Sequence, residues 1–172
     1  GALVIKEAVH KSNLKSEQID EVIMGHVLTS GLGQNPARQA SIHAGIPVTK
    51  PAYIVNQVCG SGLRSIVSGF QSIKLDPEMI VVSGGQENMS RAPHALFYRE
   101  NKKLDDTKLI DTMLNDGLID SFNHYHMGVT AENVAEKFKI SRDEQDNFAL
   151  NSQKKTQEAL SKNKFMDEII KL

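Results

Sequence analysis

An alternation of short apolar runs with helical patterns constrains the fold of this chain more than any other feature. Runs rich in branched apolar side chains occur at Glu21–Leu28, Ala52–Val58 and Met79–Ser83, and they predict three strands. Helical patterns lie between them at Pro36–Ala44 and Gly62–Leu75. Strands that alternate with helices are typical of a mostly parallel sheet covered by helices on both faces. We therefore expect an α/β fold in which these three strands are adjacent.

The only cysteine, Cys59, lies between the second predicted strand and the helix after it. The positive end of that helix favours a thiolate, and Gly60 and Gly62 leave room for a tight turn. Right-handed crossovers place Cys59 at the carboxyl edge of the sheet, where ligands usually bind. A lone cysteine is more often an inert core residue, but this setting predicts a nucleophile.

The helix after Cys59 carries an apolar stripe, formed by Leu63, Ile66, Val67, Phe70 and Ile73. We expect the helix, Gly62–Lys74, to be buried because of this stripe. The chain opens on a helical pattern with no strand before it, so we expect the first strand of the fold to be missing. Residues 91–123 predict a loop-rich region. Further predicted elements are a short helix at Leu109–Leu114, helices at Thr130–Phe138 and Ser141–Leu160, and a final strand at Phe165–Leu172.

Composition excludes several classes of function. The 172 residues carry 20 basic and 21 acidic side chains, so the formal net charge is -1 and nothing indicates a nucleic acid or membrane-surface partner. One cysteine cannot form an internal disulfide, which suits a reducing compartment. No apolar run is long enough to span a bilayer, and no signal-peptide pattern is present. We expect a cytoplasmic protein.

Two other kinds of site have weak signals. The glycines after Cys59 nearly make a dinucleotide fingerprint, but Ser65 replaces the third glycine and no acidic residue ends a strand about twenty residues on. His124 and His126 match no common zinc spacing, and no second group of ligands accompanies them. We therefore expect neither a metal site nor a resident cofactor.

Five stretches in the same order resemble motifs of the thiolase family, whose members move acyl groups between coenzyme A and carbon. The resemblance covers nearly the whole chain and is carried by Gly31–Ala40, Asn56–Leu63, Gly84–Ser90, Tyr125–Asn133 and Ile140–Asp146. It implies an α/β thiolase-type N-terminal domain, with a mostly parallel or mixed sheet between helices, at residues 1–89. Residues 90–172 would then be part of the loop domain that thiolases lay over their coenzyme A site.

The resemblance also implies roles for individual residues. Cys59 would be the nucleophile, with Gly60 and Gly62 forming the turn and oxyanion donors beside it. His126 and Met127 would line the acyl-CoA pocket, although a packing methionine beside a solvated histidine is the simpler alternative. Leu118 lies in a stretch similar to the loop that contacts pantetheine. The expected partners are acetyl-CoA or another acyl-CoA and further copies of the protein, as a homodimer or homotetramer.

The implied reaction belongs to lipid metabolism and passes through an acetyl-cysteine. Two acetyl-CoA molecules condense to acetoacetyl-CoA and coenzyme A, or the reverse thiolysis occurs. Two further family motifs, a Gly-His-Pro and a second cysteine, do not occur in these 172 residues. General-base assistance typically supplies about 10²–10⁴-fold, so we expect these residues alone not to turn over. The alternatives are an incomplete module that binds coenzyme A or dimerises, and a degradative 3-ketoacyl-CoA thiolase.

Overall fold

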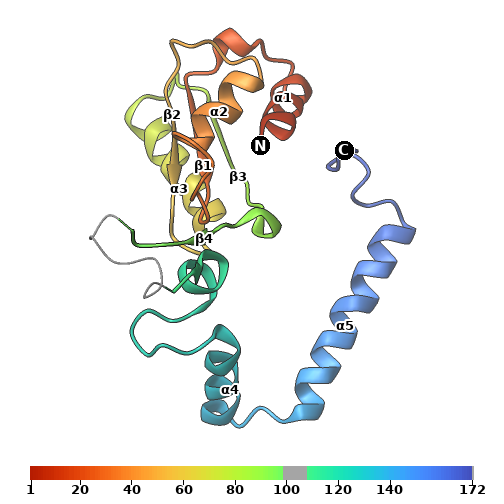
Figure 1. Cartoon of the computed structure of the whole chain (residues 1–172). Coiled ribbons are helices and arrows are strands. Elements are labelled where there is room, and N and C mark those ends of the chain that lie inside the picture. Colours follow the sequence, from red (N-terminus) through yellow and green to blue (C-terminus); the bar gives the residue numbers. More distant parts are fainter. Residues whose placement is uncertain (99–107, 172) are drawn as a thin grey trace. The chain divides into compact units, whose positions relative to one another are not determined.

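The computed structural model describes residues 1–98 and 108–171, and Figure 1 shows the course of the backbone. The chain forms two compact units, Gly1–Ile119 and Asp120–Leu172. The first unit contains the sheet, the helices that cover it and Cys59. The boundary expected after residue 89 lies inside this first unit, which also includes the segment that leads to Ile119.

The sheet of the first unit has three parallel strands in the order β2-β1-β3. The central strand is β1 (Glu21–Gly25), flanked by β2 (Ala52–Val55) and β3 (Val81–Gly85). In the register of the sheet, Ile23 pairs with both Tyr53 and Ser83. The predicted adjacency of the three strands is confirmed. The first two strands end three residues earlier than the sequence predicts, which leaves short segments free to form a site.

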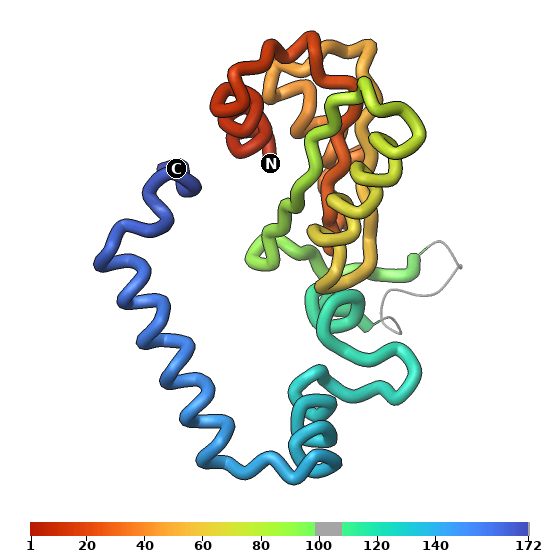
Figure 2. The backbone as a smooth tube through the Cα atoms, turned by 180° about the vertical axis from the view of Figure 1, so that it is seen from behind, coloured from red at the N-terminus to blue at the C-terminus, as the bar shows by residue number. Residues whose placement is uncertain are grey.

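Helices cover both faces of this sheet, as expected. They are α1 (Ala2–Lys11), α2 (Pro36–His43) and α3 (Ser61–Leu75). Val22 and Met24 of β1 belong to one apolar core with residues of α1 and α2. Glu21 points to the other face, where its carboxylate accepts a hydrogen bond from Ser72 of α3 at 3.1 Å. Both views of the backbone show α3 on the opposite side of the sheet from α1 and α2 (Figure 1, Figure 2).

Helix α3 contacts the sheet with its small residues and not with its apolar stripe. Its buried residues are Ser61, Ser65 and Gly69, whereas Phe70 is 58% exposed and the rest of the stripe is also exposed. A Cβ added to Gly69 would lie 2.5 Å from the Ser83 hydroxyl, so the helix lies too close to β3 for a larger side chain. The prediction that this helix is buried is therefore wrong for this chain. Its periodicity indicated a helix but not the face that contacts the sheet.

Asp20 joins the strands at the amino edge of the sheet. Its carboxylate accepts hydrogen bonds from the Ile80 amide and the Lys50 ammonium, both at 2.9 Å, and its own amide donates to the Ile80 carbonyl at 2.8 Å. The Ile80 amide, and then Lys50, hold the pKa of Asp20 below its ordinary value. This edge of the sheet is therefore closed by a fully bonded carboxylate.

After β3 the chain makes short, irregular elements. They are a 3₁₀ turn at Met89–Arg91, the antiparallel pair β4 (His94–Ala95) and β5 (Ile110–Asp111), and a π-helical turn at Leu114–Leu118; another 3₁₀ turn, Ser16–Gln18, precedes β1. Thr112 anchors the start of the last element, because its hydroxyl donates to the Pro93 carbonyl at 2.6 Å. The short helix predicted at Leu109–Leu114 is instead this π-helical turn, displaced toward the C-terminus.

The second unit contains α4 (Met127–Phe138) and α5 (Arg142–Ser161). The predicted capping box is confirmed: Ser141 caps α5, and the Glu144 carboxylate accepts from the Ser141 amide at 2.7 Å. The predicted strand at Phe165–Leu172 is wrong over its described residues, because 162–168 form turns. Their amides bond locally, as from Ile169 to the Phe165 carbonyl, whereas a strand needs a partner strand.

Candidate functional site

Cys59 lies exposed on a sharp turn between β2 and α3. The residue before it, Val58, has a φ of 48°, in the left-handed region. A β-branched residue is rarely found there, and the conformation costs about 1–2 kcal/mol. Such strained backbone is concentrated at functional sites, where the surrounding structure maintains it. The turn therefore supports the prediction that Cys59 is a reactive residue.

The side chain of Ser61 holds this turn in place. Its hydroxyl donates to the Val58 carbonyl and accepts from the Gln57 amide at 2.9 Å. The Asn56 side chain adds a bond from the Val58 amide, also at 2.9 Å. These bonds fix the backbone on both sides of Cys59 and offset the strain at Val58. The sequence suggested glycines for this turn, but it gave no sign that a serine would connect its two ends.

The glycines around Cys59 have different roles. The Gly60 amide donates to the Gln57 carbonyl at 3.0 Å, so Gly60 belongs to the turn. Gly62 lies in the first turn of α3, where a Cβ would meet no atom within 4 Å. Gly25, which sequence reasoning missed, ends β1 against this helix: a Cβ there would lie 2.4 Å from the backbone carbon of Ser61. Gly25 is thus what allows α3 to begin beside the sheet.

A cavity of about 400 Å³ opens beside Cys59 at the carboxyl edge of the sheet. Its lining combines the ends of β1 and β3, the cysteine turn and the segment around Leu118. The structure therefore brings Leu118 and Gly62 to the same cavity as Cys59, as their predicted roles require. Met89 and Leu28 add apolar surface to it. A mostly apolar cavity with a few polar groups is the usual form of a small-molecule site.

His126 and Met127 belong to the second unit. His126 is the N-cap of α4, and its Nδ1 atom accepts from the Gly128 amide at 2.9 Å. Met127 is 39% exposed at the first position of that helix. Their expected place in the acyl-CoA pocket beside Cys59 stays a prediction.

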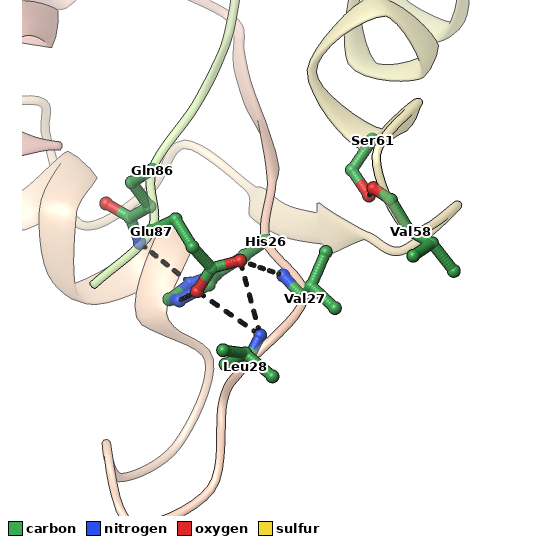
Figure 3. Close-up of polar contacts among 7 residues, drawn as sticks. All are labelled: His26, Val27, Leu28, Val58, Ser61, Gln86 and Glu87. Carbon is green, nitrogen blue, oxygen red and sulfur yellow. Dashed lines mark hydrogen bonds and ion pairs between the residues drawn. The ribbon is translucent and has the colours of Figure 1, made fainter. Parts of the chain in front are cut away.

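Glu87 and His26, also missed by sequence reasoning, line the cavity from the ends of β3 and β1. The Glu87 carboxylate accepts hydrogen bonds from the amides of Val27 and Leu28, and His26 lies against it (Figure 3). Glu87 lies within the Gly84–Ser90 stretch, which resembles a family motif, but the sequence did not indicate what its carboxylate does. The two groups are about sixty positions apart in the chain, and no local pattern could have paired them.

The described parts of the chain contain no group of three or more His, Cys, Asp or Glu side chains arranged to hold a metal ion. In the same residues we find no helix with the length and apolar character needed to cross a membrane.

The model for the N-terminal domain of thiolases matches residues 1–172. The chain belongs to the thiolase family. It is 53% identical over 171 residues to an acetyl-CoA acetyltransferase of Cupriavidus necator, and 48% identical over 170 residues to the cytosolic acetyl-CoA acetyltransferase of the rat. Each alignment covers 99% of this chain but only 44% and 43% of the relative.

A solved thiolase structure shares the fold. It is a thiolase of Ascaris suum in complex with coenzyme A, with a TM-score of 0.93, 36% identity, and coverage of 99% of this chain and 44% of that one. The expected α/β thiolase fold is thus confirmed, and the chain spans less than half the length of the curated thiolases it matches.

Proposed function

We propose that this chain supplies the nucleophile of an acetyl-CoA acetyltransferase of the thiolase type. The observation that carries the proposal is Cys59 itself, exposed on a strained turn beside a mostly apolar cavity at the start of α3. The names of relatives that are about half identical to the chain support acetyl-CoA as the substrate.

In the first step, the Cys59 sulfur attacks the carbonyl carbon of acetyl-CoA. A bond from sulfur to the acetyl carbon forms, the bond to the coenzyme A sulfur breaks, and coenzyme A leaves as its thiol, so that it gains a proton in place of the one that the Cys59 thiol has lost. Negative charge develops on the carbonyl oxygen during the attack. The first-turn amides of an α-helix lack partners within the helix, so we infer that the Gly62 amide in the first turn of α3 donates to that oxygen. Gly60 contributes the turn, since its amide is already bonded.

In the second step, another acetyl-CoA loses an α-proton to a base. Its carbanion attacks the acetyl carbon on Cys59, acetoacetyl-CoA forms, and the cysteine thiolate leaves and regains a proton. Splitting the transfer in this way is the usual logic of cysteine catalysis. By the resemblance, a second cysteine would be that base and the histidine of a Gly-His-Pro would activate the nucleophile, and these 172 residues contain neither. We therefore expect the 172 residues alone to acetylate Cys59 slowly and to form no acetoacetyl-CoA.

We also infer that the binding partners are acyl-CoA thioesters and, in the complete protein, further copies of itself. A relative crystallised with coenzyme A supports the first inference. A cytoplasmic location is supported by the single cysteine and by the rat relative named cytosolic.

Mass spectrometry after incubation with acetyl-CoA tests the proposal, best in the longest protein that carries this sequence. We expect one acetyl group on the peptide that contains Cys59, and coenzyme A released in equal amount. Prior treatment with iodoacetamide should block the transfer, and Cys59→Ala should abolish it while thermal unfolding stays unchanged. An alanine variant that still releases coenzyme A and forms acetoacetyl-CoA at the wild-type rate would show that Cys59 is not the nucleophile.

The acetylation measurement tests the first alternative, and a comparison of thiolysis rates tests the second. A module that only binds coenzyme A or dimerises would bind the ligand without covalent acetylation. A degradative 3-ketoacyl-CoA thiolase would cleave long 3-ketoacyl-CoA substrates faster than acetoacetyl-CoA.

A further inference from the structure

The segment that follows β1 is folded around a single carboxylate. The Val27 amide donates to Glu87 Oε2 at 2.9 Å, and the Leu28 amide donates to Oε1 at 3.3 Å (Figure 3). Both residues line the cavity that contains Cys59. Glu87 therefore determines where this part of the cavity wall lies.

His26 contacts the same carboxylate from the buried side. The histidine is 4% exposed, and its Nε2 atom lies 3.3 Å from Glu87 Oε1. The Gln86 side-chain nitrogen lies 3.3 Å from His26 Nδ1. An amide nitrogen can only donate, so Nδ1 accepts and the ring proton is on Nε2, facing the carboxylate. The opposite tautomer would set a lone pair against the negative charge, so both neighbours favour the same form.

The contact between His26 and Glu87 is close but poorly aligned. The Nε2 atom is within ion-pair distance of the carboxylate, yet no partner with hydrogen-bond geometry satisfies it among the residues that the structure describes. Buried polar atoms are rarely left in this state, and hydrogen bonds at active sites are often misaligned before the substrate binds. His26 is one of the residues that line the cavity, whereas the carboxylate of Asp20 at the other edge of the sheet is fully bonded.

Backbone bonds connect this cluster to all three strands. The His26 amide donates to the Val55 carbonyl of β2 at 3.1 Å, and the Gln86 amide donates to the Gly25 carbonyl of β1 at 3.0 Å. The side chains of His26, Gln86 and Glu87 thus lie where the strand ends are already fixed. The amides of Val27 and Leu28 are in turn bonded to the Glu87 carboxylate.

We propose that His26 is a positioning residue for acyl transfer to Cys59. Its Nε2–H group orients the Glu87 carboxylate, which in turn holds Val27 and Leu28 as the wall against which the thioester is aligned. The inference rests on the proposed function. A group that only fills space at position 26 would leave the carboxylate held by the Val27 and Leu28 amides alone, and we expect the wall to shift as a result.

The test compares two substitutions with different chemistry at the same buried position, in the longest protein that carries the sequence. His26→Gln retains one donor for Glu87 and one acceptor for Gln86, whereas His26→Leu fills similar space with neither. Two rates are measured at Cys59: acetylation by saturating acetyl-CoA, which needs an aligned thioester, and alkylation by iodoacetamide, which does not. His10→Leu, on an exposed face of α1, is the control for loss of a histidine.

We expect His26→Leu to lower acetylation at least about tenfold, because small displacements of a bound substrate have large effects on rate. Its alkylation rate should match that of wild type, and His26→Gln should recover most of the acetylation. Equal acetylation by the glutamine and leucine variants, whether high or low, would overturn the inference. So would a leucine variant in which both rates fall together, since that result indicates general damage to the turn.

Glu87→Gln keeps the test decisive if His26→Leu does not fold. It preserves shape, but its NH2 group replaces one of the two oxygens that face the Val27, Leu28 and His26 donors, so in either orientation a donor meets a donor. Acetylation should therefore fall while alkylation holds, and unchanged acetylation would overturn the inference. A wild-type protein that acetyl-CoA does not acetylate at all would refute the proposed function, and this inference with it. If acetyl-CoA acetylates the wild type and the variants react at the wild-type rate, the inference about His26 is refuted but the proposed function is not.

Discussion

At each edge of the sheet a carboxylate accepts hydrogen bonds from backbone amides, but the two arrangements differ in how completely their polar groups are bonded. At the amino edge, the Asp20 carboxylate is bonded to the amide of Ile80 and to the Lys50 ammonium. At the carboxyl edge, Glu87 accepts two amides, but its third neighbour, His26, is buried with an unsatisfied nitrogen. The first arrangement stabilises the fold, and the second leaves one buried nitrogen unsatisfied in a residue that lines a cavity. The unsatisfied nitrogen of His26 therefore distinguishes the edge with the candidate site from the amino edge.

The largest effect should come from Gly25→Ala at the carboxyl edge. The new methyl group would overlap the backbone of Ser61, where neither strand nor helix can move easily. We expect a loss of about 3 kcal/mol of stability, measured by urea unfolding. Gly62→Ala is the matched control, because its methyl group enters open space. A tolerated Gly25→Ala would show that α3 does not depend on this close approach.

Asp20→Ala should have the next largest effect, and at the amino edge only. It removes two charge-assisted hydrogen bonds, so we expect about 2 kcal/mol of destabilisation. The rate at which folded protein reacts with iodoacetamide at Cys59 should not change. If that rate falls together with stability, the two edges are coupled and the comparison between them fails.

Val58→Gly should stabilise the chain modestly. Glycine adopts the left-handed conformation without strain but loses more entropy on folding, and the balance favours the variant by about 0.5–1 kcal/mol. Thermal unfolding measures this gain, and Gln57→Gly, at a position without positive φ, should show none. A destabilised Val58→Gly would mean that the valine side chain contributes more by packing than its backbone costs.

The smallest effect concerns pH at the amino edge. The folded-state pKa of Asp20 is lowered, so the unfolded chain binds more protons in acid. Its stabilising contribution is present above the unfolded pKa and disappears as pH falls through the folded one. Between pH 5 and pH 2, wild type should therefore lose more stability than Asp20→Asn, by less than about 1 kcal/mol because the side chain is 36% exposed. Parallel losses in the two proteins would exclude this role.

The sequence predicted what local patterns encode. Strand and helix periodicity placed β1, β2 and α3, and the spacing of Ser141 and Glu144 predicted the start of α5. The face of α3 was wrong, because hydrophobicity does not reveal that serines and a glycine allow the closest packing. The predicted terminal strand was wrong because an apolar run forms a strand only when another strand is available to accept and donate its backbone hydrogen bonds.

The candidate site divides in the same way. The turn around Cys59 is local, and its neighbours in the chain revealed it. The contacts of Glu87 with Val27 and of His26 with Gln86 join residues about sixty positions apart, and their geometry exists only after the parallel strands have formed. Gly25 was missed for a related reason. A side chain at this position is excluded only because α3 packs against it, and that contact is not visible in the sequence.

The outward-facing stripe of α3 has a calorimetric consequence. Unfolding raises the heat capacity mainly by wetting apolar surface, by about 12–15 cal/mol/K per residue in ordinary domains. Leu63, Ile66 and Phe70 are already exposed in the folded chain, so melting adds little water contact there. The 172 residues should therefore unfold with a smaller heat-capacity increment, and a shallower dependence on urea, than their length alone predicts.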